Sequence, residues 1–149
     1  MELALDLGID LGYCIRMDNG KYHSGCMTLK NKNEDRYLAL IKLEKFLEKL
    51  NKKERITQIY IEVVNFSTTT YATQAHGSYK GEVNKWALKR MIPVEEFPVR
   101  TVKKRLTGKG NASKHGMIHY AEKWIGKEIY NHNEADAIGV MFAGRDGVK

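Results

Sequence analysis

A carboxylate in the middle of an apolar run is the strongest constraint on how this chain folds. Glu62 lies in the run 59–64, whose other residues are β-branched or aromatic, a composition typical of an interior β-strand. Because burying an unpaired charge is costly, such a side chain needs a cation to face. Asp6 directly follows the apolar residues 3–5, and Asp136 lies inside an apolar stretch near the C-terminus. Three isolated carboxylates on apolar elements suggest one metal site.

Hydrophobic periodicity and turn residues divide the chain into short strands and amphipathic helices. The Asn-Gly pair at 19–20 is typical of a tight hairpin turn, and Asn33 is expected to cap a helix whose leucines share one face. Strands are expected at 2–8, 13–17, 21–29, 56–64 and 94–97. Helices are expected after Asn33 through Leu50, and at 72–90, 99–106, 114–125 and 134–143, with Ser113 as a cap and 66–71 as a polar loop.

The order of these elements predicts an α/β fold. The first three strands follow one another through short turns and are expected to pair antiparallel. The strand at 56–64 follows a helical crossover, so it is expected to lie parallel with the first strand. This predicts a five-stranded mixed sheet, antiparallel at its N-terminal side and then parallel, with helices packed on it. A chain of 149 residues is expected to form a single domain over 1–149.

Composition narrows the classes of partner. The formal net charge of +7 favours an anionic partner, of which nucleic acid is the commonest. No apolar run approaches the roughly 18–20 residues of a spanning helix, and the N-terminus lacks the features of a signal peptide, so no membrane association and a cytoplasmic location are expected. Cys14 and Cys26 are too few for a disulfide framework or a zinc site and are expected to be reduced thiols.

If the three acids lie close together in the fold, they predict one type of reaction. Asp6 ends the first strand, Glu62 lies in a neighbouring parallel strand, and Asp136 lies early in a helix packed on the sheet, so all three can share one place. Gathered carboxylates bind hard divalent cations, and two such ions about 3.5–4 Å apart promote in-line displacement at phosphorus. The implied reaction is phosphodiester hydrolysis. The simpler alternative is that Asp6 sits in a turn, Glu62 pairs with a lysine and Asp136 caps a helix.

Motifs along nearly the whole chain resemble a known family. Asp6-Leu7-Gly8 is followed by Gly12-Tyr13, then Ile61-Glu62, the basic stretch 102–114 and finally 134–137. Their order and spacing resemble the RuvC family of Holliday-junction resolvases, within the RNase H-like superfamily. The resemblance implies an RNase H-like fold with helices on both faces of the sheet. It also implies a crossover junction endodeoxyribonuclease: a homodimer that binds four-way DNA junctions and nicks two strands symmetrically. The implied cofactor is Mg²⁺ or Mn²⁺, with two ions per active site and no small-molecule cofactor.

Two positions of the implied metal site are ambiguous. Asp10 is an alternative to Asp6, but Asp6 directly follows the apolar strand and is preferred. The family often has an acid or a histidine three residues before its last aspartate, and that position is Asn133 here. Either Asn133 or His132, both on the helix face of Asp136, completes the site, or Glu134 reaches it from a non-helical start, or Asn133 replaces an acid and inactivates the protein.

Basic and aromatic residues around the acids predict a DNA surface. No acid occurs between Phe97 and Tyr120, a stretch rich in lysine and arginine. Clustered cations neutralise phosphates, and a helix N-terminus favours an anion, although such a run can also be a solvated helix face. The resemblance places lysines that match Lys103 and Lys114 near the active site. The residues predicted to contact DNA are Lys103, Lys104, Arg105, Lys109, Ser113 and Lys114. Phe66 and Tyr71 are predicted to stack on bases.

Other interpretations share parts of this prediction. The small residues of the helix at 72–91 permit a tight two-fold contact, which the resemblance implies is the dimer element. A nuclease of the same superfamily acting on flaps, other branched DNA or RNA–DNA hybrids keeps the same metal site. A catalytically weakened junction-binding protein is the third alternative, and Asn133 is the reason to consider it.

Overall fold

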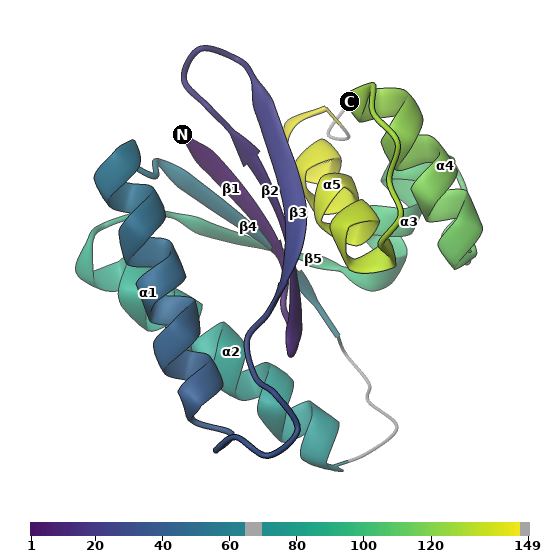
Figure 1. Cartoon of the computed structure of the whole chain (residues 1–149). Coiled ribbons are helices and arrows are strands. Elements are labelled where there is room, and N and C mark those ends of the chain that lie inside the picture. The colour runs from purple at the N-terminus through teal and green to yellow at the C-terminus, as the bar shows by residue number, and fades with distance from the viewer. Residues whose placement is uncertain (65–69, 147–149) are drawn as a thin grey trace.

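A five-stranded mixed sheet forms the centre of the protein in the computed structural model, which describes residues 1–64 and 70–146 (Figure 1). The strand order is β3-β2-β1-β4-β5, with β1–β2 and β2–β3 antiparallel and β1–β4 and β4–β5 parallel. The predicted sheet is therefore confirmed. The strands are β1 (Glu2–Asp6), β2 (Asp10–Arg16), β3 (Tyr22–Thr28), β4 (Gln58–Val63) and β5 (Val94–Pro98).

Helices cover both faces of the sheet. One group packs on one face and the second group, with α5 against β1 and β2, covers the other (Figure 1). The first group is α1 (Leu38–Lys53) and α2 (Thr70–Lys89); the second is α3 (Val99–Thr107), α4 (Lys114–Ile125) and α5 (His132–Arg145). No helix in the described parts of the chain is long and apolar enough to cross a membrane.

Strand alternation divides the buried side chains into two cores. Leu3 and Leu5 belong to the core beneath α1 and α2, whereas Ala4 between them belongs to the core beneath α3, α4 and α5. Tyr60 of β4 also belongs to the second core. Side chains two residues apart point to the same face of a strand. Asp6 therefore lies on the same face as Ala4, and Glu62 on the same face as Tyr60, which is the face that α5 covers. The register Leu5↔Ile61 makes these two acids neighbours across the parallel pair.

Three predicted helix starts are wrong. The helix α2 begins at Thr70, two residues before its predicted start, and the other two starts differ for local reasons. Asn33 is not a cap: α1 begins only at Leu38, after Tyr37, which makes no side-chain cap. The segment before it is held instead by Glu34, whose carboxylate accepts hydrogen bonds from the backbone and side chain of Asn31. The last helix begins at His132, two residues before the predicted start, because Asn131 caps it by accepting from the N–H groups of residues 133 and 134.

A glycine in β2 lets the start of α5 touch the sheet. Gly12 pairs with Asp6 across the β1–β2 ladder. A Cβ atom at Gly12 would lie 2.0 Å from the backbone oxygen of Asn133 and 2.5 Å from its carbonyl carbon. Only glycine therefore allows this approach. Since Asp136 lies three residues beyond Asn133, less than one helical turn, the contact holds Asp136 beside the strand ends that carry Asp6 and Glu62.

We predict that Gly12→Ala destabilises the protein, because the added methyl group must push the first turn of α5 away from β2. Overpacking of this kind costs about 1–3 kcal/mol. Gly8→Ala is the control, since its Cβ would meet only the backbone oxygen of Asp10 at 3.7 Å, an ordinary contact. Urea unfolding of both variants measures the difference; equal stabilities would contradict the tight contact.

Candidate active site

The structure brings Asp6, Glu62 and Asp136 together beside the C-terminal ends of the interior strands β1 and β4. Glu62 is the buried charged residue of the described chain, with 8% of its surface exposed, and Asp6 and Asp136 are partly buried. Each of the two aspartates interacts electrostatically with Glu62, and Asp6 also interacts with Asp136. The side chains come from the end of β1, from β4 and from the second turn of α5, so the fold itself assembles the group.

Burial raises the pKa of all three carboxyl groups, and repulsion from neighbouring carboxylates raises it further at Asp6 and Glu62. Desolvation is the main cause at each position. The pKa of Asp6 is raised well above its ordinary value by burial and then by the charges of Glu62 and Asp136. Burial and Asp136 raise the pKa of Glu62 to about 8 against the charge of Lys103, and burial raises that of Asp136 to about 6 against nearby cations. The three carboxylates are therefore poorly compensated without a further cation.

In the part of the chain that the structure describes, these acids have no direct ion-pair partner. Among the described residues, none of the salt bridges involves Asp6, Glu62 or Asp136, so the simpler alternative of a Glu62–lysine pair is not what the structure contains. Nor does Asp136 cap its helix, because Asn131 does. Three carboxylates that each favour a positive neighbour are a donor set that fits a hard divalent cation.

The fit rests on chemistry rather than on a preformed cage. Within residues 1–64 and 70–146, no group of three or more His, Cys, Asp or Glu side chains is close enough together to hold a metal ion. Repulsion among the carboxylates opposes such a spacing until a cation offsets it. The residues that would hold the cation are Asp6, Glu62 and Asp136.

Asp10, the alternative to Asp6, lies outside this group. It is exposed at the start of β2, and its Oδ1 accepts a hydrogen bond of 3.0 Å from the hydroxyl of Thr28 on β3. The geometry therefore favours Asp6, whose carboxyl group is affected by both Glu62 and Asp136.

The candidates for the fourth ligand lie in the first turn of α5 and have different neighbours. Glu134 points elsewhere: it accepts a hydrogen bond of 2.7 Å from Ser24 and lies 2.8 Å from the amine of Lys127. His132 lies close enough to Asp136 to influence its carboxyl group. The side chain of Asn133 hydrogen-bonds the thiol of Cys26, which also lies near Asp6.

Sequence reasoning missed the place of Cys26. Both cysteines are free thiols, as predicted, and burial raises the pKa of both. The β2–β3 register pairs Gly12 with Cys26, which brings the thiol to the edge where Asp6 lies. The Asn-Gly hairpin sets the antiparallel register of β2 and β3. From that register, the position of Cys26 near Asp6 could have been predicted.

Two of the predicted basic residues lie beside the acids. Lys103 of α3 acts on both Glu62 and Asp136, and Lys114 at the start of α4 acts on Asp136. Ser113 caps α4 as predicted, since its hydroxyl accepts a 3.0 Å hydrogen bond from the backbone of Gly116. Lys104 and Lys109 are both exposed.

Arg105, which is predicted to contact DNA, also makes contacts within the fold. Its Nη1 donates a 2.9 Å hydrogen bond to the backbone oxygen of Ala143, and its guanidinium lies 5.0 Å from the centre of the Phe97 ring. The side chain therefore ties α3 to α5 and β5. The positive charges of a basic run are not equivalent, and this one is used inside the fold.

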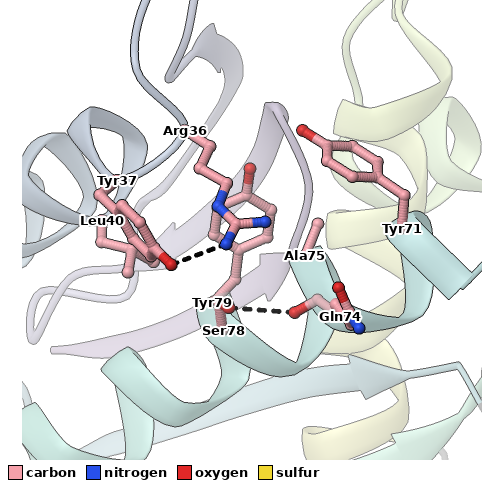
Figure 2. A pocket seen from close by; sticks show the side chains of 8 residues that line it. All are labelled: Arg36, Tyr37, Leu40, Tyr71, Gln74, Ala75, Ser78 and Tyr79. Carbon is pink, nitrogen blue, oxygen red and sulfur yellow. Dashed lines mark hydrogen bonds between the residues drawn. The ribbon is translucent and has the colours of Figure 1, made fainter.

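The predicted stacking residues have different outcomes. Phe66 lies outside the described residues. Tyr71 is not in a loop as predicted but in the first turn of α2, where 53% of its surface is exposed. It lines a pocket opposite Arg36 and Tyr37, with Tyr79 between them (Figure 2).

A family model matches most of the chain. The description of that family is "Crossover junction endodeoxyribonuclease RuvC", and the match spans residues 10–143. The chain belongs to the RuvC family. The match begins after Asp6, so the assignment of Asp6 depends on the geometry above.

Curated RuvC proteins are similar over almost their whole length. The RuvC of Brachyspira hyodysenteriae is 28% identical over 93% of this chain and 92% of its own. The RuvC of Sulfurovum is 26% identical over 96% of each chain. Structures of Thermus thermophilus RuvC share the fold: the one in complex with a Holliday junction substrate gives a TM-score of 0.79 at 20% identity, covering 98% of this chain and 95% of that one. The yeast mitochondrial Holliday junction resolvase gives a TM-score of 0.62 at 16% identity, covering 94% and 74%.

We predict that Glu62→Gln stabilises the protein at pH 8 in the presence of EDTA. The pKa of Glu62 is raised from 4.5 to about 8, so its contribution to stability is full below pH 4.5 and is lost as the pH rises to about 8. Glutamine cannot ionise, so the gain over wild type appears at pH 8 and vanishes near pH 4.5.

Thermal unfolding between pH 4.5 and 8 measures this effect, at about 2–4 °C for each kcal/mol in a protein of this size. Asp10→Asn removes one exposed carboxylate near the same edge and is the matched control. A pH-independent difference between Glu62→Gln and wild type would contradict the repulsive carboxylate group.

Proposed function

We propose that the chain resolves Holliday junctions by metal-dependent hydrolysis of phosphodiester bonds at Asp6, Glu62 and Asp136. The observation that carries the proposal is the burial of three mutually repelling carboxylates, without ion-pair partners in the described chain, beside Lys103 and Lys114. Membership of the RuvC family and the similarity to a resolvase structure with a Holliday junction substrate support this substrate class.

The three carboxylates have the role of catalytic ligands in this proposal. Their oxygens would hold Mg²⁺ or Mn²⁺, with two ions in each site. Bound ions of this kind activate a water molecule and stabilise the leaving oxygen during an in-line displacement at phosphorus. The chain's own contribution is a rigid frame: β1, β4 and α5 fix the three side chains, and Gly12 holds α5 against β2.

Asn133 has a supporting role in the site. Its amide hydrogen-bonds Cys26 and its backbone rests on Gly12, so the residue anchors the helix that carries Asp136. The amide oxygen can add a neutral ligand. His132, which lies near Asp136, is the other candidate for the fourth position.

Basic side chains next to the acids would hold the DNA backbone. Lys103 and Lys114 face the carboxylates and would position the phosphate that is cut. Lys104, Lys109 and the capped N-terminus of α4 at Ser113 would contact flanking phosphates. Tyr71, and Phe66 by sequence alone, are proposed to stack on bases at the branch.

The complete enzyme is proposed to be a homodimer of single-domain chains acting in the cytoplasm. Two symmetric nicks need two active sites, and α2 offers a surface for a second copy. Gly77 and Gly81 are exposed there, and a Cβ at either would meet nothing within 4 Å. The nearby Leu88 and Met91 are 79% and 89% exposed. Small and apolar residues together suit a two-fold helix contact.

We predict that Asp6→Asn and Asp136→Asn each lower the rate of four-way junction cleavage in Mg²⁺ by more than roughly 100-fold, the upper range for loss of a residue that only supports metal ligands. Junction binding in EDTA should persist, because the lysines remain. Asp10→Asn should cleave like wild type. Flaps, RNA–DNA hybrids and linear duplex tested in parallel distinguish junction resolution from broader nuclease activity. Full activity of Asp6→Asn with loss in Asp10→Asn would contradict the assignment.

We predict that Lys114→Ala weakens junction binding and reduces the slope of log affinity against log salt by about 0.9, the value for one lost phosphate contact. Lys45→Ala is the control, since Lys45 is exposed on α1, on the opposite face of the sheet. Fluorescence anisotropy at several salt concentrations measures both slopes. The same slope for Lys114→Ala and wild type would show that Lys114 makes no phosphate contact.

A further inference from the structure

A closed group of three polar side chains ties the first turn of α5 to the sheet. Ser24 of β3 donates a 2.7 Å hydrogen bond from its hydroxyl to Oε1 of Glu134, and the amine of Lys127 lies 2.8 Å from the same oxygen. The Lys127 amine also donates a 3.2 Å hydrogen bond to the backbone oxygen of Ser24. We call these three residues the α5 clamp. The clamp joins an outer strand, the connection from α4 to α5, and the helix that carries Asp136 (Figure 1).

Glu134 is the most strongly held member of the α5 clamp. Its side chain is 13% exposed, against 47% for Lys127. Charged hydrogen bonds are stronger where little water competes for the partners. Glu134 also lies in the first turn of α5, where the helix dipole favours a negative charge. Its carboxylate is therefore fixed against β3 by contacts that require one orientation of the side chain.

Apolar packing provides much less information about the rotation of α5. The buried residues of this helix are small or aliphatic: Ala135, Ala137, Ile138, Gly139, Val140, Met141 and Ala143. Neighbouring residues of a helix are about 100° apart, so the consecutive buried positions 137–141 face all sides of α5. Attraction among apolar groups is non-directional. The directional contacts of the α5 clamp are therefore suited to setting the rotation of this helix about its axis.

That rotation determines where Asp136 points. Glu134 and Asp136 are two residues apart, or roughly 200° around the helix, so they face nearly opposite sides. Glu134 faces the outer strand β3, whereas Asp136 faces Glu62 and Asp6 on the interior strands. A rotation that separates Glu134 from Ser24 therefore moves Asp136 relative to Glu62. The close contact at Gly12 limits the distance between α5 and the sheet, and the α5 clamp limits its rotation.

We propose that Glu134 is a positioning residue of the metal site. Held by Ser24 and Lys127, it fixes the rotation of α5 at which the Asp136 carboxylate reaches a cation shared with Glu62. The inference rests on the proposed metal-dependent cleavage, and Glu134 itself contacts neither the cation nor the phosphate that is cut. It gives β3 and the α4–α5 connection a role in a site whose three carboxylates come from other elements.

Lys127→Met is the decisive variant because positioning and charge predict opposite results. Removing a cation near the acids strengthens Mn²⁺ binding by charge alone, whereas opening the α5 clamp weakens it. We expect Lys127→Met, Ser24→Ala and Glu134→Gln each to weaken Mn²⁺ binding by roughly tenfold, the lower end for residues that orient metal ligands. The electron paramagnetic resonance signal of free Mn²⁺ measures this affinity without DNA. Combining Lys127→Met with Glu134→Gln should cost no more than Glu134→Gln alone, because both changes open the same clamp.

Two controls separate positioning from a general loss of stability. Glu96→Gln removes an ion pair of similar length, 2.9 Å to Lys80, which joins α2 to β5 and does not involve α5. It should bind Mn²⁺ like wild type, and urea unfolding of all variants measures their stabilities. In junction cleavage, Lys127→Met should need roughly tenfold more Mn²⁺ for half its maximal rate and should reach the wild-type rate at saturation.

The outcomes distinguish this inference from the proposed activity. If wild type binds Mn²⁺, Asp136→Asn does not, and Lys127→Met binds it as tightly as wild type or more tightly, the positioning role of Glu134 is overturned and the activity is unaffected. A loss of stability in Lys127→Met without a loss of Mn²⁺ affinity would also overturn it. If wild type binds no Mn²⁺, the proposed metal site and this inference fail together. Weaker Mn²⁺ binding by Lys127→Met would support the inference even if wild type cut no junctions, a result that contradicts the proposed function alone.

Discussion

The burial of the Glu62 carboxylate without a basic partner is the constraint on which the rest of the site depends. With 8% of its surface exposed, Glu62 has little water to solvate its charge, and Asp6 and Asp136 add repulsion. Lys103 offsets this only in part. A fold that keeps three acids in this state sacrifices stability, and a divalent cation is the partner that recovers it. Metal binding and stability of the active arrangement are therefore linked.

The sheet sets where these charges lie, and α5 brings the third. The parallel β1–β4 register makes Asp6 and Glu62 neighbours, and strand alternation turns both toward α5. At Gly12 the helix backbone reaches the sheet itself, so Asp136 approaches the pair with little freedom. A cavity lies between α2 and the residues that directly follow β1.

Sequence patterns predicted the sheet and the three acids because these follow from short-range rules. Alternation and turn residues fix strands and their pairing, and a lone acid on an apolar element stands out. The partners that individual side chains contact were not predictable from the sequence. Arg105 looked like its basic neighbours yet bonds Ala143, and Asn33 looked like a cap although α1 begins later. The contacts of Cys26 with Asn133, and of His76 with Leu7, join residues far apart in sequence and depend on helix placement.

The most direct measurement of the central claim is the position of manganese in crystals of the wild-type protein soaked in Mn²⁺, located by anomalous diffraction at the manganese edge. The account predicts anomalous density among the carboxylates of Asp6, Glu62 and Asp136, and its loss in Glu62→Gln. Density only at exposed acids such as Asp10, with none among the three buried carboxylates, would contradict it.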